Sequence, residues 1–458
     1  MIQFRDLLLS AKQVFYSTTG ETGHFNADRA SAARSSFLKQ HSLFTTLKSL
    51  RGNPRGIVLS EPLWGIPYNL YAPFISVYML ALGLKDQQIG LIVSVSWGFQ
   101  VLLALLSGMV VDKLGRRRTT LIADILSWAV PALISALAQN FWYFLAAGVV
   151  NSIWRVSNTA WNCLLVEEAD QSQLVDIFTW IYIANILVGF IAPLAAAFIG
   201  AFSLVPTMRG LYVFAAVMFT IKAIVTYRTT RETHQGEVRM HETRHQNGIE
   251  ILKEYKGVFN ILLHSPKTLY TAGILLVLGI SSMISGSFWA VLATEKLHVP
   301  PQTLAYFPFI RSAAMLAFFF GVTPRISKLH FKLPLVIGFL GYIVSQILLV
   351  TAPSQGYAFL FLNVILEACC FAAVQPLMDR MLVLTIDPKE RARIQSIMFM
   401  FTILITSPFG WIAGTLSGIN KNLPFILNMV LFALGAWLAA LAGRESQKES
   451  AADALIAS

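Results

Sequence analysis

The segment GMVVDKLGRRRTT, residues 108–120, places a cluster of charges between two long apolar stretches. One apolar stretch runs from about residue 89 to residue 111, and the next begins at residue 121. Between them lie the carboxylate of Asp112 and the basic side chains of Lys113, Arg116, Arg117 and Arg118. A hydrophobic stretch of about 20 residues is long enough to span a bilayer as a helix. The segment is therefore predicted to be a charged hairpin between two membrane-spanning helices.

The composition of the whole chain agrees with a membrane protein. Of its 458 residues, 55% are hydrophobic and 13% are charged, and the mean hydropathy is +0.62. A soluble domain carries about 25% charged residues. The net charge of +11 would suggest nucleic acid binding in a soluble protein, but here the basic residues lie between the apolar segments. We therefore expect a chain embedded in the lipid bilayer, with no nucleic acid partner.

Twelve apolar segments of sufficient length follow one another along the chain. Each must be helical in lipid, because every backbone amide needs a partner within its own segment. The predicted spans are residues 57–83, 88–111, 119–138, 141–165, 174–200, 209–228, 268–294, 303–323, 333–351, 357–384, 391–419 and 422–443.

The polar stretches divide these spans into two sets of six. Residues 164–180 and 383–399 are similar turns in corresponding positions, so the two halves are predicted to be repeats. The helical apolar spacing of residues 248–263 predicts an amphipathic helix on the inner membrane face. The predicted parts are a basic tail over residues 1–56 (or residues that precede the true start), a bundle over 57–228, a linker over 229–267, a bundle over 268–443 and a tail over 444–458.

The distribution of Lys and Arg predicts the orientation. One set of loops holds only Lys85, Arg209, Lys296 and Lys421, whereas the loops that alternate with them hold most of the other basic residues. Basic loops face the cytoplasm. We therefore expect a multi-pass protein of the cell membrane with both termini in the cytoplasm.

The charged hairpin also carries a family motif. Gly108, Asp112, Gly115, Arg116 and Arg117 fit the pattern G-x-x-x-D-x-x-G-R-[RK]. This motif lies between helices 2 and 3 of the major facilitator superfamily, which the chain resembles from about residue 57 to residue 443. The resemblance implies an all-α membrane protein with twelve transmembrane helices in two six-helix bundles around a central cavity.

The resemblance further implies a conformational latch on the cytoplasmic side. Gly108 would allow a close helix approach, and Gly115 would allow a tight turn. Asp112 would accept hydrogen bonds at the N-terminus of helix 11, near residues 389–391. Two further carboxylates, Glu167 and Glu168 at the end of helix 4, would pair with the arginines of the motif. The alternative is that the basic residues only enforce topology.

Six ionisable residues within the predicted spans are singled out as intramembrane charges: Glu61, Asp124, Arg155, Lys222, Arg311 and Glu367. Such residues are costly in lipid and usually face a cavity. We expect Lys222 to extend to the membrane surface and Asp124 to pair with the basic loop, and the role of Arg311 stays open. Glu61 with Arg155 is similar to the proton-coupling pair of some sugar–proton symporters, and Glu367 is the rival proton carrier.

In this superfamily helices 1, 4, 7 and 10 line the cavity. Each of the corresponding segments carries a stripe of polar and aromatic residues, which is typical of a solute-binding surface. The expected cavity residues are Trp64, Tyr68, Asn151, Trp154, Asn158, Asn162, Ser285, Trp289, Asn363 and Gln375.

These observations favour a proton-coupled secondary transporter for a small polar organic solute, with a saccharide as one candidate. An exporter or flippase of amphipathic drugs or lipids is the alternative, and a non-transporting receptor on the same fold is a third hypothesis. No catalytic, cofactor or metal-ligand motif is apparent, and Cys163, Cys369 and Cys370 are interpreted as packing residues. The expected partners are the solute, protons and the bilayer, and the protein is expected to be a monomer.

Overall fold

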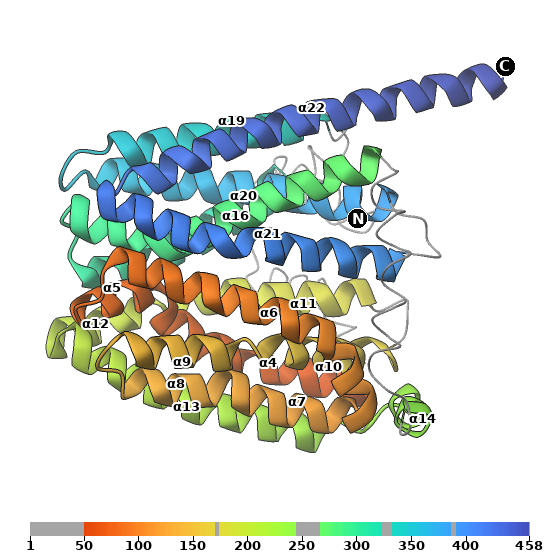
Figure 1. Cartoon of the computed structure of the whole chain (residues 1–458), viewed down its shortest axis with the longest axis horizontal. Helices are drawn as coiled ribbons and strands as arrows, with labels where there is room; N and C mark the ends of the chain where they lie inside the picture. The colour runs from red at the N-terminus through yellow and green to blue at the C-terminus, as the bar shows by residue number, and fades with distance from the viewer. Residues whose placement is uncertain (1–49, 170–173, 244–265, 323–331, 386–390, 458) are drawn as a thin grey trace, which may run out of the picture.

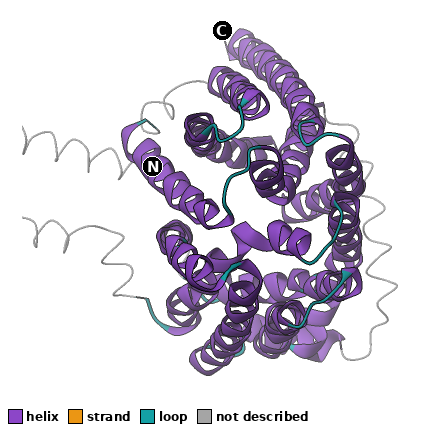
Figure 2. Ribbon diagram, turned by 90° about the vertical axis from the view of Figure 1, so that its left-hand side faces the viewer, coloured by secondary structure: helices purple, strands orange, loops and turns teal. Residues whose placement is uncertain are grey.

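The computed structural model describes residues 50–169, 174–243, 266–322, 332–385 and 391–457. All regular secondary structure in these residues is helical. The helices of the N-terminal half form one bundle, and those of the C-terminal half form a second bundle beside it (Figure 1). Seen along the helix axes, the two bundles face each other across the middle of the molecule (Figure 2).

The N-terminal bundle contains six spans, four of which are interrupted. The continuous ones are α6 (Asp86–Leu114) and α13 (Leu204–Thr229). The others are divided as follows: α4 (Gly52–Tyr71), η1 (Ala72–Phe74) and α5 (Ile75–Ala81); α7 (Arg116–Asp124), η2 (Ile125–Ala129) and α8 (Val130–Ala136); α9 (Phe141–Asn151) and α10 (Trp154–Val166); α11 (Leu174–Val188), η3 (Gly189–Ile191) and α12 (Pro193–Phe202).

The C-terminal bundle also contains six spans. The first two combine α16 (Pro266–Val291) with η5 (Leu292–Lys296), and η6 (Pro301–Ala305) with α17 (Tyr306–Gly321). The remaining four are the continuous helices α19 (Lys332–Thr351), α20 (Tyr357–Thr385), α21 (Arg391–Ile419) and α22 (Leu423–Ala457).

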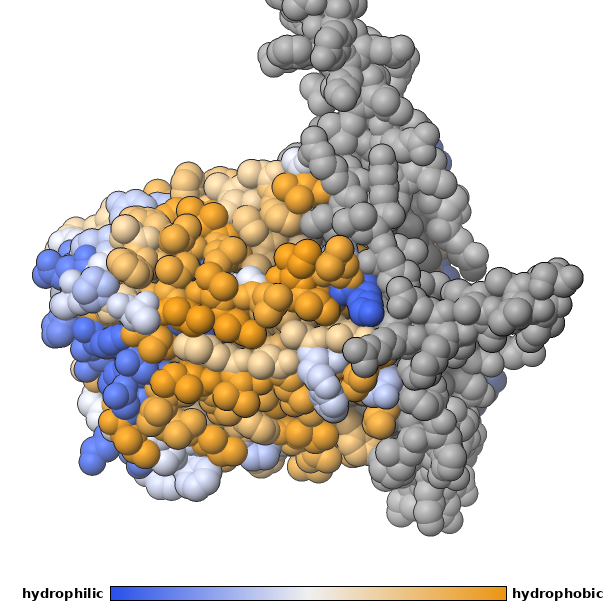
Figure 3. Space-filling model, turned by 90° about the horizontal axis from the view of Figure 1, so that it is seen from above, coloured by the Kyte–Doolittle hydropathy of each residue, from blue (hydrophilic) through white to orange (hydrophobic). Residues whose placement is uncertain are grey.

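Nine helices in the described part of the chain are long and apolar enough to cross a membrane. The other three spans are the first, the fourth and the eighth. The first contains Pro62 and Pro67, the fourth is divided between α9 and α10, and α17 has 16 residues. Seen from the side of α19 and α22, the molecule presents a broad hydrophobic face with polar residues gathered at one end (Figure 3). Such a face suits contact with lipid tails.

The fourth span is interrupted at the point where it packs against α6. Ser152 follows α9, and its hydroxyl donates a hydrogen bond to the backbone oxygen of Ser96 in α6 (2.8 Å). Gly148 lies against the same serine, where a Cβ would overlap the Ser96 hydroxyl. The fourth span therefore packs closely on α6 just before Trp154 and Arg155 begin α10.

The two ends of the helices differ in how the bundles meet. We call the end that holds Lys85 and Lys421 the outer end, following the charge distribution, and the end that holds Arg116 and Glu232 the inner end. At the outer end, Asp86 of α6 forms an ion pair with Lys421 (2.7 Å). The same carboxylate accepts a short hydrogen bond from the hydroxyl of Ser417 in α21. These contacts join the N-terminal bundle to the C-terminal bundle.

Further contacts continue this seam along α6 and α21. The Ser407 hydroxyl donates to the backbone oxygen of Ser94 (2.8 Å), and the Ser94 hydroxyl accepts from the backbone amide of Trp411 (2.7 Å). On the other side of the molecule, Ser76 of α5 donates to the backbone oxygen of Ser287 in α16 (2.5 Å). The bundles are therefore closed against each other at the outer end.

Two parts of the chain differ from the sequence-based expectations. The linker contains α14 (His234–Glu242), a helix that the sequence reasoning did not anticipate. The helix expected over residues 248–263 lies outside the described residues. The last helix runs on to Ala457, so the segment expected as a tail after residue 443 is helical.

Candidate functional site

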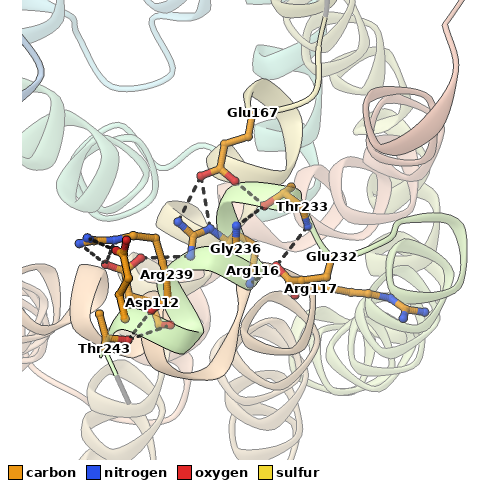
Figure 4. Close-up of polar contacts among 10 residues, drawn as sticks. Asp112, Arg116, Arg117, Glu167, Glu232, Thr233, Gly236, Arg239 and Thr243 are labelled. Carbon is orange, nitrogen blue, oxygen red and sulfur yellow. Dashed lines mark hydrogen bonds and ion pairs between the residues drawn. The ribbon is translucent and has the colours of Figure 1, made fainter. Parts of the chain in front are cut away.

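A network of charged and polar side chains covers the inner end of the N-terminal bundle (Figure 4). At its centre the chain turns into α7 at Gly115, whose φ of 82° is a conformation that favours glycine. The carboxylate of Glu232 accepts hydrogen bonds from the backbone amides of Arg116 (2.8 Å) and Arg117 (3.0 Å). Amides in the first turn of a helix have no partner within it, and the helix dipole favours an anion there. Glu232 therefore stabilises the start of α7.

The linker helix α14 docks on the same hairpin. Thr233 caps α14 by accepting a hydrogen bond from the amide of Gly236 (3.0 Å). From the last turn of α14, Arg239 forms an ion pair with Asp112 (3.1 Å), and Asp112 also pairs with Arg116 (3.1 Å). The negative charge of Asp112 raises the pKa of the Arg239 guanidinium above its usual value. The linker is thus attached to the motif on which the family resemblance rests.

The network extends to the end of the fourth span. Arg116, which is buried, forms an ion pair with Glu167 (3.3 Å). Glu167 also accepts a short hydrogen bond from the hydroxyl of Thr233. The hairpin, the fourth span and the linker therefore meet around one arginine, and all three belong to the N-terminal half of the chain.

Two of the contacts expected for the latch differ from those observed. Arg117 donates to the backbone oxygen of Tyr227 (2.9 Å) and lies over the Tyr227 ring, so its expected pairing with Glu168 is wrong. Glu168 instead accepts hydrogen bonds from the Asn53 amide (3.5 Å) and from the His234 backbone (3.3 Å). Tyr227, at the end of the sixth span, offers the Arg117 side chain both a backbone oxygen and a ring face.

The close helix approach expected at Gly108 is not seen among the described residues. A Cβ at Gly108 would meet nothing within 4 Å, so the residue makes no close helix contact with the described part of the chain. The predicted contact of Asp112 with the start of helix 11, near residues 389–391, falls largely outside the described residues. A latch between the two bundles therefore stays a prediction.

A second group of charges is buried between α4, α7 and α13. Asp124 and Lys222 form an ion pair at 2.6 Å, and both side chains are buried. The Ser157 hydroxyl donates a short hydrogen bond to the other oxygen of Asp124. Glu61, which is also buried, interacts electrostatically with both members of the pair. The expected extension of Lys222 to the membrane surface and the expected pairing of Asp124 with the basic loop are therefore wrong.

The expected pair of Glu61 and Arg155 is not the pair that forms. Glu61 faces α7 and α13, whereas the Nε of Arg155 donates to the side-chain oxygen of Gln100 in α6 (3.0 Å). The Arg155 guanidinium also lies over the ring of Trp154, 4.0 Å from its centroid. The two residues lie on neighbouring helices but have different partners.

Glu367, the rival proton carrier, has a different arginine beside it. Its carboxylate lies 3.9 Å from the guanidinium of Arg311 in α17. The Arg311 side chain is 45% exposed, and it also lies near the ring of Phe371. Arg311, whose role the sequence left open, is thus the partner of Glu367 in the C-terminal bundle.

The expected cavity residues of the first span form an aromatic cluster. Trp64 stacks on Tyr68 with 4.8 Å between ring centroids. Trp128 meets both rings edge-on, at 5.1 Å from Trp64 and 6.1 Å from Tyr68. All three side chains are partly buried against the hydrophobic core, and we call this group the aromatic wall.

The polar residues of the fourth span differ in exposure. The amide of Asn151 donates to the backbone oxygen of Ser127 (2.7 Å), and that of Asn162 donates to the backbone oxygen of Asn158 (2.8 Å). The side chain of Asn158 is exposed. Among the expected cavity residues of this span, Asn158 is therefore the one with its amide free to meet a solute.

The C-terminal bundle contains one clear correction. Asn363 is fully buried, where its amide donates to Ser345 of α19 and its oxygen accepts from the indole of Trp289 (3.1 Å). Its expected place in the cavity is therefore wrong for this conformation, because the hydrogen bonds tie three helices together. Ser285 accepts a hydrogen bond from Asn428 (3.3 Å), and Gln375 is partly buried.

The described residues offer no group of three His, Cys, Asp or Glu side chains that could hold a metal ion. The three cysteines are free thiols. Within the part of the chain that the structure describes, the polar clusters are therefore built from ion pairs and hydrogen bonds.

The sequence reasoning missed the linker residues Glu232, Thr233 and Arg239. A signal was present, because Thr233 is a preferred N-cap residue and Arg239 lies in the last turn of the short helix it starts. The segment lacks an apolar stripe, which is the signal on which helix prediction mainly depends. Its stability comes instead from polar contacts with residues more than 100 positions earlier in the chain.

Comparisons with known proteins agree with this architecture. A family model described as Major Facilitator Superfamily matches residues 63–353. No curated protein sequence matches the chain.

Three solved structures illustrate the likeness in fold. A point mutant of the nucleoside transporter NupG is 16% identical with a TM-score of 0.67, and the match covers 86% of this chain and 99% of that chain. A bacterial homolog of the human lysosomal transporter Spinster, inward-facing and occupied, is 14% identical with a TM-score of 0.60, covering 85% of this chain and 96% of that one. The human organic anion transporter MFSD10 (TETRAN) is 16% identical with a TM-score of 0.56, covering 84% and 98%. At these identities the likeness concerns the fold. Together with the family match over most of the chain, the two six-helix bundles show that this multi-pass membrane protein belongs to the major facilitator superfamily.

Proposed function

We propose that the protein is a secondary active transporter, which moves a small organic solute across the cell membrane by alternating access. The observation that carries this proposal is the exposure of Asn158 and Arg311 and the partial exposure of Arg155, all within membrane-spanning segments. Charged side chains within a span are costly in lipid and usually face a water-filled cavity. In this family fold such a cavity lies between the two bundles, which rock around a central solute. Closure at the outer end corresponds to one of the two states of that cycle.

Proton coupling is the second part of the proposal. Asp124 and Lys222 neutralise each other, so the nearby Glu61 carboxylate is an additional negative charge in a buried place. A proton on Glu61 would remove that charge, and its release would restore it. Glu367 is the alternative carrier, because Arg311 lies beside it and movement of the helices would change their distance of 3.9 Å.

The aromatic wall and the exposed amide support a solute with both a ring face and polar groups. Trp64 and Tyr68 supply ring surfaces for stacking, and Asn158 supplies a hydrogen-bonding group. Saccharides and nucleosides both have this character. Trp-rich walls would also suit an amphipathic drug or lipid, so export of such molecules is the second candidate function.

Reconstitution into liposomes tests transport and coupling together. The purified protein is placed in vesicles that contain a pH-sensitive dye, and saccharides, nucleosides, nucleotides, organic acids, drugs and lysolipids are added in turn. We expect at least one class to move protons with it and to accumulate when a pH gradient is imposed. Accumulation of lysolipid or drug alone would favour the second candidate function, and binding without flux would favour a receptor.

The carboxylate that carries the proton is identified by substitution. Glu61→Gln is expected to abolish accumulation driven by the pH gradient while exchange of labelled for unlabelled solute continues, because exchange needs no proton step. Glu295→Gln is the matched control, since Glu295 is exposed at the end of the seventh span. Loss of coupling in Glu367→Gln instead would transfer the role to Glu367. Full accumulation in both variants would contradict proton coupling through either residue.

A further inference from the structure

The guanidinium of Arg155 is held on two sides and left open on the others. Gln100 of α6 accepts a hydrogen bond from its Nε (3.0 Å), and the Trp154 ring lies 4.0 Å from its central carbon. Gln100 is buried, so the anchoring group is itself fixed. These two contacts orient the planar group but leave its terminal nitrogens without a hydrogen bond to any described residue. An arginine carries five donors, and four of them belong to these two terminal nitrogens.

Arg155 differs in this respect from the other five intramembrane charges that the sequence singles out. Lys222 pairs with Asp124 at 2.6 Å, and Arg311 lies 3.9 Å from Glu367. Glu61 interacts with Lys222. No acidic side chain in the described part of the chain pairs with Arg155. An unpaired cation within a membrane span is costly, and holding its side chain in one orientation adds to that cost. Packing gives no reason for such a residue, whereas binding of an anion does.

We propose that Arg155 binds the anionic group, a carboxylate or a phosphate, of the transported solute. This inference rests on the transport function proposed above and specifies its solute class as an organic anion. The terminal nitrogens of a guanidinium match the two oxygens of a carboxylate or phosphate, and the pair is stronger when both bonds form together. Lysine would supply charge without that geometry.

The surroundings of Arg155 suit the rest of such a solute. Asn158 lies three residues further along α10, about 4.5 Å away along the helix axis, and its side chain is exposed. It offers a donor and an acceptor beside the anionic group. The indole of Trp154 holds the other face of the guanidinium, so a solute approaches Arg155 from the side of the terminal nitrogens.

The charges within the spans also suit an anion that moves with a proton. The six intramembrane charges singled out from the sequence sum to zero, with three carboxylates balanced by three cations: Glu61, Asp124, Glu367, Arg155, Lys222 and Arg311. A monoanion on Arg155 together with one proton on Glu61 leaves that sum unchanged. The loaded and the empty transporter would then carry the same charge through the low-dielectric part of the membrane.

Binding to the purified full-length protein tests the inference without any need for flux. Thermal unfolding is measured with pairs of compounds that differ in charge: glucose and glucose 6-phosphate, glucose and glucuronate, adenosine and AMP, monooleoylglycerol and oleoyl lysophosphatidate. At least one anion is expected to raise the unfolding temperature where its neutral counterpart does not. The lysolipid pair distinguishes a lipid headgroup from a soluble anion as the source of the same chemistry.

Substitutions then locate the binding group. Arg155→Gln is expected to weaken binding of the stabilising anion roughly 10- to 100-fold, because charge-assisted hydrogen bonds are lost. Arg155→Lys should retain part of the affinity, and this variant keeps the inference testable if Arg155→Gln does not fold. Arg209→Gln is the matched control, since Arg209 donates to the backbone oxygen of Ala138 at the outer end. The Arg209→Gln protein should bind the stabilising anion with the same affinity as the wild type.

Three results would overturn the inference: equal stabilisation by neutral and anionic members of the pairs, unchanged anion affinity in Arg155→Gln, or no stabilisation by any anion in the set. Failure of the transport proposal looks different. An anion that binds in an Arg155-dependent way but does not cross reconstituted vesicles would leave the binding site in place and remove the transport function.

Discussion

At the scale of single residues, the inner end shows how one carboxylate can organise three segments. The carboxylate of Glu232 accepts hydrogen bonds from the backbone amides of Arg116 and Arg117. Its position requires glycine at the two neighbouring positions, 115 and 236. A Cβ at Gly115 would approach its carboxylate to 2.7 Å, and a Cβ at Gly236 would overlap it. The geometry alone therefore excludes larger residues at both positions while Glu232 keeps its place.

Removal of this carboxylate should loosen the start of α7. Glu232→Ala leaves two helix amides without a partner and is expected to cost about 1 kcal/mol of stability. Hydrogen exchange of the amides in residues 116–119 should accelerate. Glu237→Ala is the control, because Glu237 is exposed on the adjoining helix α14. Equal exchange in the two variants would show that Glu232 does not cap α7.

At the scale of elements, α6 and α21 approach each other closely where the two bundles meet. A Cβ at Gly90 would overlap the backbone oxygen of Gly410 and would lie 2.8 Å from the Cα of Gly414. These neighbours are backbone atoms, which cannot move aside as a flexible side chain can. The outer half of the seam therefore depends on small residues, as is common where membrane helices pack closely.

An alanine at Gly90 should therefore open the seam. Overpacking of this kind costs about 1–3 kcal/mol, which shifts a two-state balance roughly 5- to 150-fold away from the closed outer end. In a background without the three native cysteines, Ser94→Cys should react faster with an impermeant thiol reagent when Gly90→Ala is present. Gly98→Ala on the same helix is the control, since its Cβ would meet only the Ser407 hydroxyl at 3.5 Å. An unchanged rate in the Gly90→Ala protein would contradict this view of the seam.

At the scale of the whole molecule, the twelve spans follow from the sequence because hydrophobic length is a local property that any span must have. The partners of buried charges do not follow, because they depend on how each helix is rotated and on which distant helix it faces. Lys222 lies near the end of its span, and this position predicts that it reaches the membrane surface. Its partner is instead Asp124, which is 98 residues away in the sequence. Likewise, the sequence identified Arg155 and Glu61 as unusual, and only the packing shows that they face different neighbours.

The same scale decides which contact holds the outer end closed. Asp86 is 5% exposed and lies between Ser417 and Lys421, so it joins the first half of the chain to the last. Without its cation, the buried carboxylate keeps one hydroxyl partner and loses an ion pair, at a cost of about 1–2 kcal/mol to the closed state. In the proposed alternating-access cycle, that cost corresponds to a roughly 5- to 30-fold shift between the two states.

Lys421→Gln should therefore populate a state with a wider outer end. Spin labels on Gln139→Cys and Ser354→Cys, at exposed positions on opposite bundles, report the separation as a distance distribution. The wild type should show mainly the short distance, and Lys421→Gln should add a longer one. Lys85→Gln removes an exposed positive charge beside Asp86 and should leave the distribution unchanged. If both variants match the wild type, the closed outer end depends on helix packing along α6 and α21 and not on this ion pair.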